Sequence, residues 1–432
     1  MRKWFSVVLC STFFLLSMVV NSSAEISSAE LLRILKEKGI ITDEDIKKAE
    51  ELKREDEEVV VKAARRPKSV NFKGRVQARY TSIENDDLSK VTSQKAFDES
   101  EFDGFAIRRV RLRWFGEVVD RWKYHVQISA DGDQNADKLD PATPDYALKK
   151  EDIGLKLQDA YFTYDMNPYF NITVGQFKSR FSPSYLTSGP VLPLCERPLV
   201  IDKLARRREI GISIESAKSG QLDGRGHGTK VHYKPIYYAV GLYNGNKFNN
   251  MRNDNENFMA TAMFVVRPSK YINFGVSYAY DHVGYDSETT VLGKAEEVEI
   301  NKKKYYVFEV KDSKVGERMN IWDFNTALDA GPVHIQVEYV QQHGHGFDRA
   351  YGYGVQGQVD LTDKFQLTAR YDEYDPNVKV DNTFDCRWYT AGFNWFLHGQ
   401  NVKWQLNYTF REEMHGENVD NDALITHFQV LF

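Results

Sequence analysis

The sequence predicts an all-β protein, a transmembrane antiparallel β-barrel of about 16 strands. Three observations lead to this fold class. Long stretches alternate between apolar and polar residues, as strands with one apolar and one polar face do. Short turns alternate with long polar connections along the chain. The 432 residues are rich in aromatic side chains, with 26 Phe, 24 Tyr and 7 Trp, yet no stretch after residue 24 offers the run of about 20 apolar residues that a spanning helix needs.

The first 24 residues have the pattern of a secretory signal peptide. Two cations in MRKW precede an apolar run from Phe5 to Val20, and Ser22-Ser23-Ala24 then supplies small residues that signal peptidase accepts. A transmembrane anchor is the alternative, but the run is short for one. Residues 1–24 are therefore expected to direct export and to be cleaved.

Residues 25–68 are predicted to form a helical and charged periplasmic segment that ends in a linker. Leu31, Leu35 and Ile46 fit two short helices broken at Gly39, and the stretch starting at Thr42 resembles a capping box. Residues 53–68 mix charges densely, which is typical of a linker. Trimerisation, contact with the cell wall and no role at all are the open alternatives for this segment.

Residues 69–432 are predicted to form the barrel. Every second residue is apolar from Val402 to Phe410, Phe365 to Asp372, Val333 to Tyr339 and Trp122 to Ser129. Seven turns join fourteen strands, and a first strand at Asn71 to Tyr80 and a last one at Ala423 to Phe432 complete about sixteen. The turns are Asp120-Arg121, Asn167-Pro168, Pro268 to Lys270, Gly331-Pro332, Thr362 to Lys364, His398 to Asn401 and a less distinct one within 217–235. The long polar connections are 82–103, 131–154, 176–207, 244–257 and about 281–317, with shorter ones near 342–350, 375–386 and 413–422.

Short turns at one end, long loops at the other and an even strand number are features of outer-membrane barrels. A barrel of this size is too wide for side chains to fill, so its interior holds water. The chain ends in ITHFQVLF, which places Phe428, Val430 and Phe432 on one face and is similar to the aromatic C-terminal signature of outer-membrane proteins. The outer membrane of a Gram-negative-type cell, in contact with its lipid, is therefore the expected location. A secreted β-sandwich is the alternative, with shorter strands.

Cations gather on one face of the first three barrel strands. In RRVRLRW, arginines at every second position oppose Val110, Leu112 and Trp114. A cation facing lipid costs about 2 to 4 kcal/mol near the midplane, so the arginines are predicted to face the lumen. The predicted pore-lining cations of these strands are Lys73, Arg75, Arg79, Arg109, Arg111, Arg113 and Lys123. Salt bridges with inward loops are the alternative fate for some of them, and the far wall is nearly neutral, with the acids Asp323, Glu338, Asp360 and Asp372 among Gln, Asn and Thr.

The connection that follows the fifth strand is too long and too apolar for an ordinary exposed loop. Phe181, Tyr185, Leu192, Leu194 and Leu199 predict that this third loop folds into the barrel and packs on the inner wall. A loop that crosses the barrel mouth is the alternative. Its further candidate pore-lining cations are Lys178, Arg180, Arg206, Arg207 and Arg208. Cys195 in this loop and Cys386 could pair, but two cysteines do not make a disulfide framework.

Several stretches resemble the phosphate-selective porin O/P family. They are FAIRRVRLRWFGEVVDRWKYHVQIS, LQDAYFTYDMNPYFNITVGQFKSRFSPSYLTSG, REIGISIE and AVGLYNG. The resemblance covers most of the chain from about Asn71 to Phe432. It implies a homotrimer of sixteen-stranded barrels whose lumen carries arginine and lysine to a constriction formed by the infolded third loop, and phosphate or a related oxyanion as solute. Lys178 in GQFK and Arg109, Arg111 and Arg113 carry over residue by residue.

We therefore expect a passive, anion-preferring porin and no enzyme, cofactor or metal. The chain has no GxSxG or HExxH motif, and His343-Gly-His345 lacks ligands at metal-binding spacing. Nucleic-acid binding is unsupported, because the basic residues point into a barrel. The net charge of -5 is compatible with a basic lumen, since acids gather in the outer loops and the N-terminal segment. The alternatives are a general or carbohydrate porin, and a barrel enzyme or surface adhesin that acts through its loops.

Overall fold

The computed structural model describes the barrel part of the chain. The described residues are 67–84, 104–132, 153–167, 169–216, 235–247, 249–253, 255–282, 290–300, 303–312, 318–344, 347–379, 385–415 and 420–432. The predicted signal peptide, the predicted helical segment up to residue 66 and the less distinct turn within 217–234 lie outside them. Among the helices that these ranges contain, none is long and apolar enough to cross a membrane.

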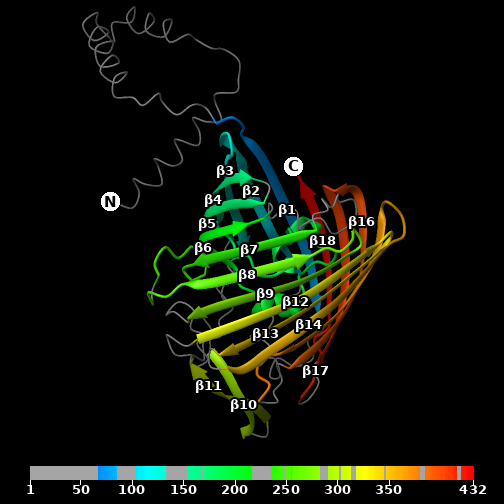
Figure 1. Ribbon diagram of the computed structural model, residues 1–432. Coiled ribbons are helices and arrows are strands. Elements are labelled where there is room, and N and C mark those ends of the chain that lie inside the picture. Colours follow the sequence, from blue (N-terminus) through cyan, green and yellow to red (C-terminus); the bar gives the residue numbers. More distant parts are fainter. Residues whose placement is uncertain are drawn as a thin grey trace, which may run out of the picture. The chain divides into compact units, whose positions relative to one another are not determined.

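The described residues form eighteen strands. The first nine are β1 (Asn71–Ile83), β2 (Gly104–Val119), β3 (Trp122–Gly132), β4 (Ile153–Asn167), β5 (Phe170–Lys178), β6 (Arg208–Glu215), β7 (Ile236–Tyr243), β8 (Met259–Val266) and β9 (Ile272–His282). They are followed by β10 (Thr290–Ile300), β11 (Lys303–Asp312), β12 (Arg318–Ala330), β13 (Val333–Gly344), β14 (Phe347–Asp360), β15 (Phe365–Asp375), β16 (Cys386–Gln400), β17 (Val402–Glu413) and β18 (Ala423–Leu431). All except β10 and β11 form one closed antiparallel barrel of sixteen strands, in which β1 pairs with β18 (Figure 1). The predicted fold class is confirmed.

The strand register explains why cations share one face. Lys73 lies opposite Arg113 and Arg75 opposite Arg111 in the β1–β2 ladder, so the side chains of both strands alternate in step. Arg75 is buried on the lumen side, whereas its neighbour Val76 is 37% exposed on the lipid side. This alternation places the cations toward the lumen and the apolar residues toward lipid.

One long connection is not the irregular polar loop that the sequence predicts. Within 281–317, β10 and β11 pair as a separate two-stranded sheet, with Ile300 opposite Lys303. The prediction followed the high charge of this stretch. It underweighted the β-branched and aromatic residues, such as Val291, Val298 and Tyr305, which favour strands.

The third loop lies inside the barrel, as predicted. It contains α5 (Pro183–Leu186), η2 (Gly189–Val191) and α6 (Leu199–Leu204). Phe181 and α6 form a buried cluster with side chains on the inner wall from β9 to β16, and Tyr185 packs against this cluster. Leu186 packs instead on β7 and β8, and Cys195 on β1 and β18. Because Cys195 and Cys386 belong to different clusters, no disulfide joins them.

Gly175 in β5 is expected to be essential for barrel stability. Its φ is +128°, and a Cβ would overlap the carbonyl oxygen of Ala160 on β4 and lie 2.8 Å from the Cα of Tyr161. We expect Gly175→Ala to destabilise the barrel by about 1 to 3 kcal/mol or more, from backbone strain alone. The temperature at which the folded band disappears in heat-modifiability gels measures this. Gly357→Ala is the control, because nothing lies within 4 Å of its Cβ position; equal shifts for both variants would contradict the expectation.

Candidate functional site

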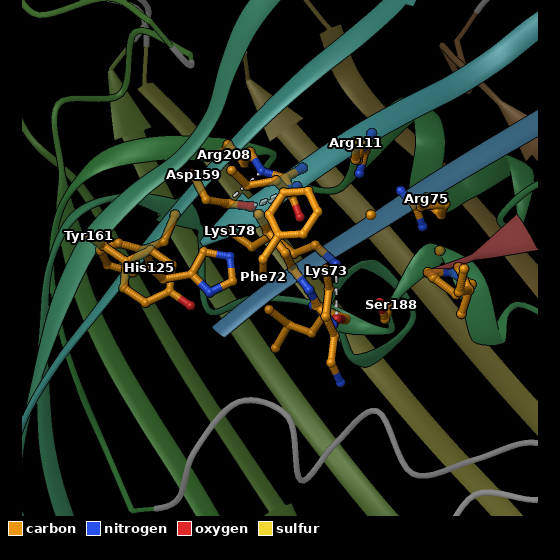
Figure 2. Close-up of a pocket in the computed structure, with 18 of the residues that line it drawn as sticks. Phe72, Lys73, Arg75, Arg111, His125, Asp159, Tyr161, Lys178, Ser188 and Arg208 are labelled. Carbon is orange, nitrogen blue, oxygen red and sulfur yellow. Dashed lines mark hydrogen bonds and ion pairs between the residues drawn. The ribbon is translucent and has the colours of Figure 1, made fainter. Parts of the chain in front are cut away.

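A cavity of about 590 Å³ lies between the lumen face of β1–β5 and the segment of the third loop around Ser188. Figure 2 shows side chains from several of these strands converging on it. Among the described residues that line it, seven are Lys or Arg and one, Asp159, is acidic. The cations are Lys73, Arg75, Arg111, Arg113, Lys178, Arg180 and Arg208. Seven of the twelve predicted pore-lining cations are therefore brought together at this cavity.

Two of these cations keep their charge available to a solute. Among the described residues, Lys73 and Arg113 make no ion pair; each lies over the Phe115 ring, at 5.9 and 5.4 Å from its centroid. Arg208, by contrast, is held by Asp159 through two hydrogen bonds of 2.8 and 3.1 Å, drawn as dashed lines in Figure 2. Gln127 also donates to Asp159, so this carboxylate is saturated by the wall itself.

A second cluster of cations surrounds a carboxylate of the third loop. Glu196 accepts hydrogen bonds from Arg108 Nε at 2.8 Å, from Arg109 Nη2 at 2.9 Å and from Arg79. Burial alone would raise the pKa of Glu196, but the charges of Arg108, Arg109 and Arg79 outweigh it and hold this pKa well below its usual range. Arg79 and Arg109, predicted as pore-lining, thus have the loop's own anion as their partner.

A β-bulge makes this cluster possible. In the β1–β2 ladder Gln77 pairs with Arg109 and the next residue, Ala78, pairs with Ile107, so Arg108 is the extra residue. The bulge lets consecutive arginines, Arg108 and Arg109, reach the same loop carboxylate. Sequence reasoning missed Arg108, because strict alternation assigns it to the lipid face; the Arg108-Arg109 dipeptide was the available signal.

The predicted cations of the third loop have structural partners. Lys178 Nζ donates to the carbonyl oxygens of Tyr185, Leu186 and Thr187, at 2.9, 3.0 and 3.1 Å. Arg180 forms a buried ion pair of 3.0 Å with Glu215 on β6. These bonds hold the beginning of the third loop against the ends of β5 and β6.

The remaining three predicted cations lie away from the cavity. Arg206 is paired with Asp281 on β9, and Arg207 lies 3.8 Å from Asp202, with both side chains exposed. Lys123 pairs with Asp165 and lines a smaller cavity of about 320 Å³. Their role in translocation stays a prediction.

The far wall holds the loop through polar side chains whose role as anchors the sequence did not indicate. Lys403 Nζ donates to the carbonyl oxygen of Leu192 at 2.9 Å, and Asn394 Nδ2 to that of Pro193 at 2.7 Å. The amide of Cys195 donates to Asn407 Oδ1 at 2.7 Å. Three further bonds anchor the loop: Asp372 accepts from the amide of Leu199, Arg370 donates to the carbonyl oxygen of Glu196, and Glu338 accepts from the hydroxyl of Ser182. The loop therefore bridges the lumen, bound at both walls.

The part of the chain that the structure describes contains no group of three or more His, Cys, Asp or Glu that could hold a metal. The side chains of the cavity offer charge and hydrogen bonds to a solute. A wall of fixed cations that faces a narrow aqueous space attracts anions and raises their local concentration.

Comparison with known proteins agrees with this architecture. The sequence profile of the family described as phosphate-selective porin O and P matches residues 70–432. An uncharacterized protein of Aquifex aeolicus (strain VF5) is 24% identical over 425 residues, which cover 93% of this chain and 94% of that protein.

Three solved structures share the fold at low identity. The anion-selective porin from Comamonas acidovorans has a TM-score of 0.52 and 8% identity, covering 84% of this chain and 99% of its own. The outer membrane channel DcaP of Acinetobacter baumannii has a TM-score of 0.51 and 13% identity, covering 86% of this chain and 100% of its own. The trimer form of OmpT from Vibrio cholerae has a TM-score of 0.50 and 10% identity, covering 84% of this chain and 99% of its own.

Proposed function

Because the chain belongs to the phosphate-selective porin O and P family and forms a sixteen-stranded barrel, it is an outer-membrane porin, and we propose that its channel prefers anions, phosphate and related oxyanions in particular. The observation that carries the proposal is the cavity of about 590 Å³ with seven cations and one acid among its described lining residues. Lys73 and Arg113, which lie over the Phe115 ring and make no ion pair among the described residues, are the side chains whose charge would act most directly on a passing anion.

The magnitudes favour selection by this wall. A unit charge about 5 Å from one cation gains on the order of 3 kcal/mol at an effective dielectric constant of 20. Salt screens charges beyond about 10 Å at 0.1 M, so the effect belongs to the narrow space beneath the loop. Passage also needs release, which several weak sites allow better than one deep site.

We further propose that residues 1–24 are a cleaved signal peptide and that residues 25–68 form a periplasmic segment. The assembly is a homotrimer, which the trimer form of the structurally similar OmpT from Vibrio cholerae supports. The structurally similar anion-selective porin from Comamonas acidovorans supports the passage of anions.

The test is the reversal potential of the purified channel in a potassium chloride gradient. We expect an anion-signed potential in the wild type and a chloride current that falls when phosphate is added. In Lys73→Gln/Arg113→Gln, the chloride-over-potassium permeability ratio is expected to fall by about twofold to fivefold, because a fraction of the Coulomb attraction disappears.

The matched control is Arg121→Gln/Lys270→Gln, which also removes one Lys and one Arg, but from exposed turns. It is expected to leave the ratio unchanged. A cation-signed potential in the wild type would reject anion preference. An anion-signed potential without phosphate block would reject the preference for phosphate.

A carbohydrate porin is the second candidate, because part of the lumen wall is aromatic. A channel of that kind would be blocked by neutral sugars, and its current would respond little to phosphate.

A further inference from the structure

A continuous row of aromatic side chains crosses the lumen face of the cationic wall. Its members are Phe115 on β2, His125 on β3, Tyr161 on β4, Phe177 on β5 and Tyr243 on β7. Successive ring centroids are 6.1, 5.0, 5.8 and 5.7 Å apart. The register causes this arrangement, since Phe115 lies directly opposite His125 and His125 directly opposite Tyr161. Many aromatic residues of the described strands, such as Phe72, Trp122 and Phe162, are exposed on the lipid side, so a row in the lumen was not expected from the sequence.

The row stands where two cavities meet. The larger cavity of about 590 Å³ and the smaller one of about 320 Å³ share His125, Tyr161 and Arg180 among their lining residues. The smaller cavity lies at the end of the barrel that carries the short turns, because Ser69 and Lys123 line it. A solute that moves from the space beneath the loop toward this end passes the His125–Tyr161 pair. Figure 2 shows the two rings side by side at the edge of the larger cavity.

Cations alternate with the rings along the same wall. Lys73 and Arg113 lie over Phe115, and the guanidinium of Arg180 lies 4.9 Å from the centroid of Phe177. His125 and Tyr161 stack with their planes 6° apart, and both are half-buried, so each retains surface toward the solvent-filled space. Phe177 and Tyr243 are buried and serve as support beneath the row.

This combination fits a particular kind of anion. A strongly hydrated inorganic anion gains nothing from the faces of the rings, because a ring face offers no hydrogen bond in exchange for its water. A flat anion with an unsaturated body can place its carboxylate beside a cation and its ring against the aromatic pair. We propose that His125 and Tyr161, together with Arg113, form a subsite for planar aromatic carboxylates. The proposal rests on the anion preference proposed above and names a further class of anion that the channel admits.

The test compares two blockers of equal charge and similar size on the full-length channel in planar bilayers. Benzoate is flat, whereas cyclohexanecarboxylate is puckered. We expect benzoate to reduce the chloride current at a concentration about threefold to tenfold lower than cyclohexanecarboxylate does. Tyr161→Leu is expected to remove most of this difference, while Tyr161→Phe, which keeps the ring, retains it. Tyr164→Leu is the matched control, since the ring of Tyr164 packs against that of Trp122 on the lipid side, with the centroids 4.8 Å apart.

Each outcome decides the matter. Equal block by the two acids in the wild type overturns the proposal, and so does a Tyr161→Phe variant that behaves like Tyr161→Leu. Heat-modifiability gels establish that each variant is folded before it is compared. A cation-signed reversal potential in the wild type would reject the anion preference itself, which is a separate readout from the ratio of the two blockers.

Discussion

Replacing Glu196 with glutamine is expected to raise the chloride-over-potassium permeability ratio several-fold. The carboxylate of Glu196 is the shared partner of Arg79, Arg108 and Arg109, and its side chain is 30% exposed to the lumen. Glutamine keeps the length of the side chain and removes its charge, so one more positive charge acts on ions in the channel. A gain of about 1 kcal/mol, a fraction of the unscreened interaction at close range, corresponds to a factor of about five. Reversal potentials of both proteins in the same salt gradient measure it.

The loop should keep its place in this variant, because its bonds to the far wall do not involve the carboxylate of Glu196. Asp202→Asn is the control, since Asp202 is 65% exposed and lies on the same loop. A lower permeability ratio together with a larger conductance would contradict the expectation. It would show that Glu196 serves only to hold the third loop against β1 and β2.

Protonation of Glu196 in acid is expected to give the wild-type channel the selectivity of Glu196→Gln. Since the pKa of Glu196 is depressed in the folded channel, its ion pairs persist above the ordinary value of 4.5 and are lost only as pH falls through the lower folded value. The difference in selectivity between wild type and Glu196→Gln should therefore survive at pH 4.5 and vanish only in stronger acid.

Alternation and turn chemistry were sufficient to predict the barrel. The strand at Val402–Glu413 shows the period-2 pattern from Val402 to Phe410, and the tight turns carry Gly, Pro, Asn or Asp. These are local properties, so a single sequence contains them. The β10–β11 hairpin was missed because it has no place in a barrel-wide pattern and its stretch is rich in charge.

The site was predictable in part, because a lumen position follows from alternation but a partner does not. The spacing of the cations at 73, 75, 111 and 113 predicts one shared face, and in the structure they line the same cavity. That Glu196 would meet Arg79 and Arg109 depends on how a loop crosses the lumen, which alternation does not encode. The bulge at Arg108 breaks the alternation itself, so a rule based on period 2 necessarily misassigns that residue.

Removal of the far-wall anchors is expected to have the opposite effect on selectivity from the loss of Glu196. Lys403, Asn394 and Asn407 hold the main chain of the loop at Leu192, Pro193 and Cys195. Each lost bond costs about 0.5 to 1.5 kcal/mol. Gln405 Nε2 still lies 3.2 Å from the carbonyl oxygens of Leu192 and Pro193, but the three losses together should loosen the loop from this wall. A constriction that retreats widens the lumen and moves fixed charges away from the permeating ions. We expect Asn394→Ala/Lys403→Met/Asn407→Ala to raise single-channel conductance by about twofold or more and to lower the anion permeability ratio.

The control for this triple variant is Thr390→Ala/Thr409→Ala, on the same two strands. These hydroxyls bond to each other at 3.1 Å on the lumen side. Their loss should leave conductance at the wild-type value, because it removes polarity from the wall without releasing the loop. Unchanged conductance in the triple variant would contradict the expectation and would show that the remaining contacts, among them those of Phe181 and α6 with the wall from β9 to β16, are enough to hold the loop. The two directions of change separate the roles of the loop: its carboxylate tempers the positive wall, and its bulk narrows the path along which that wall acts.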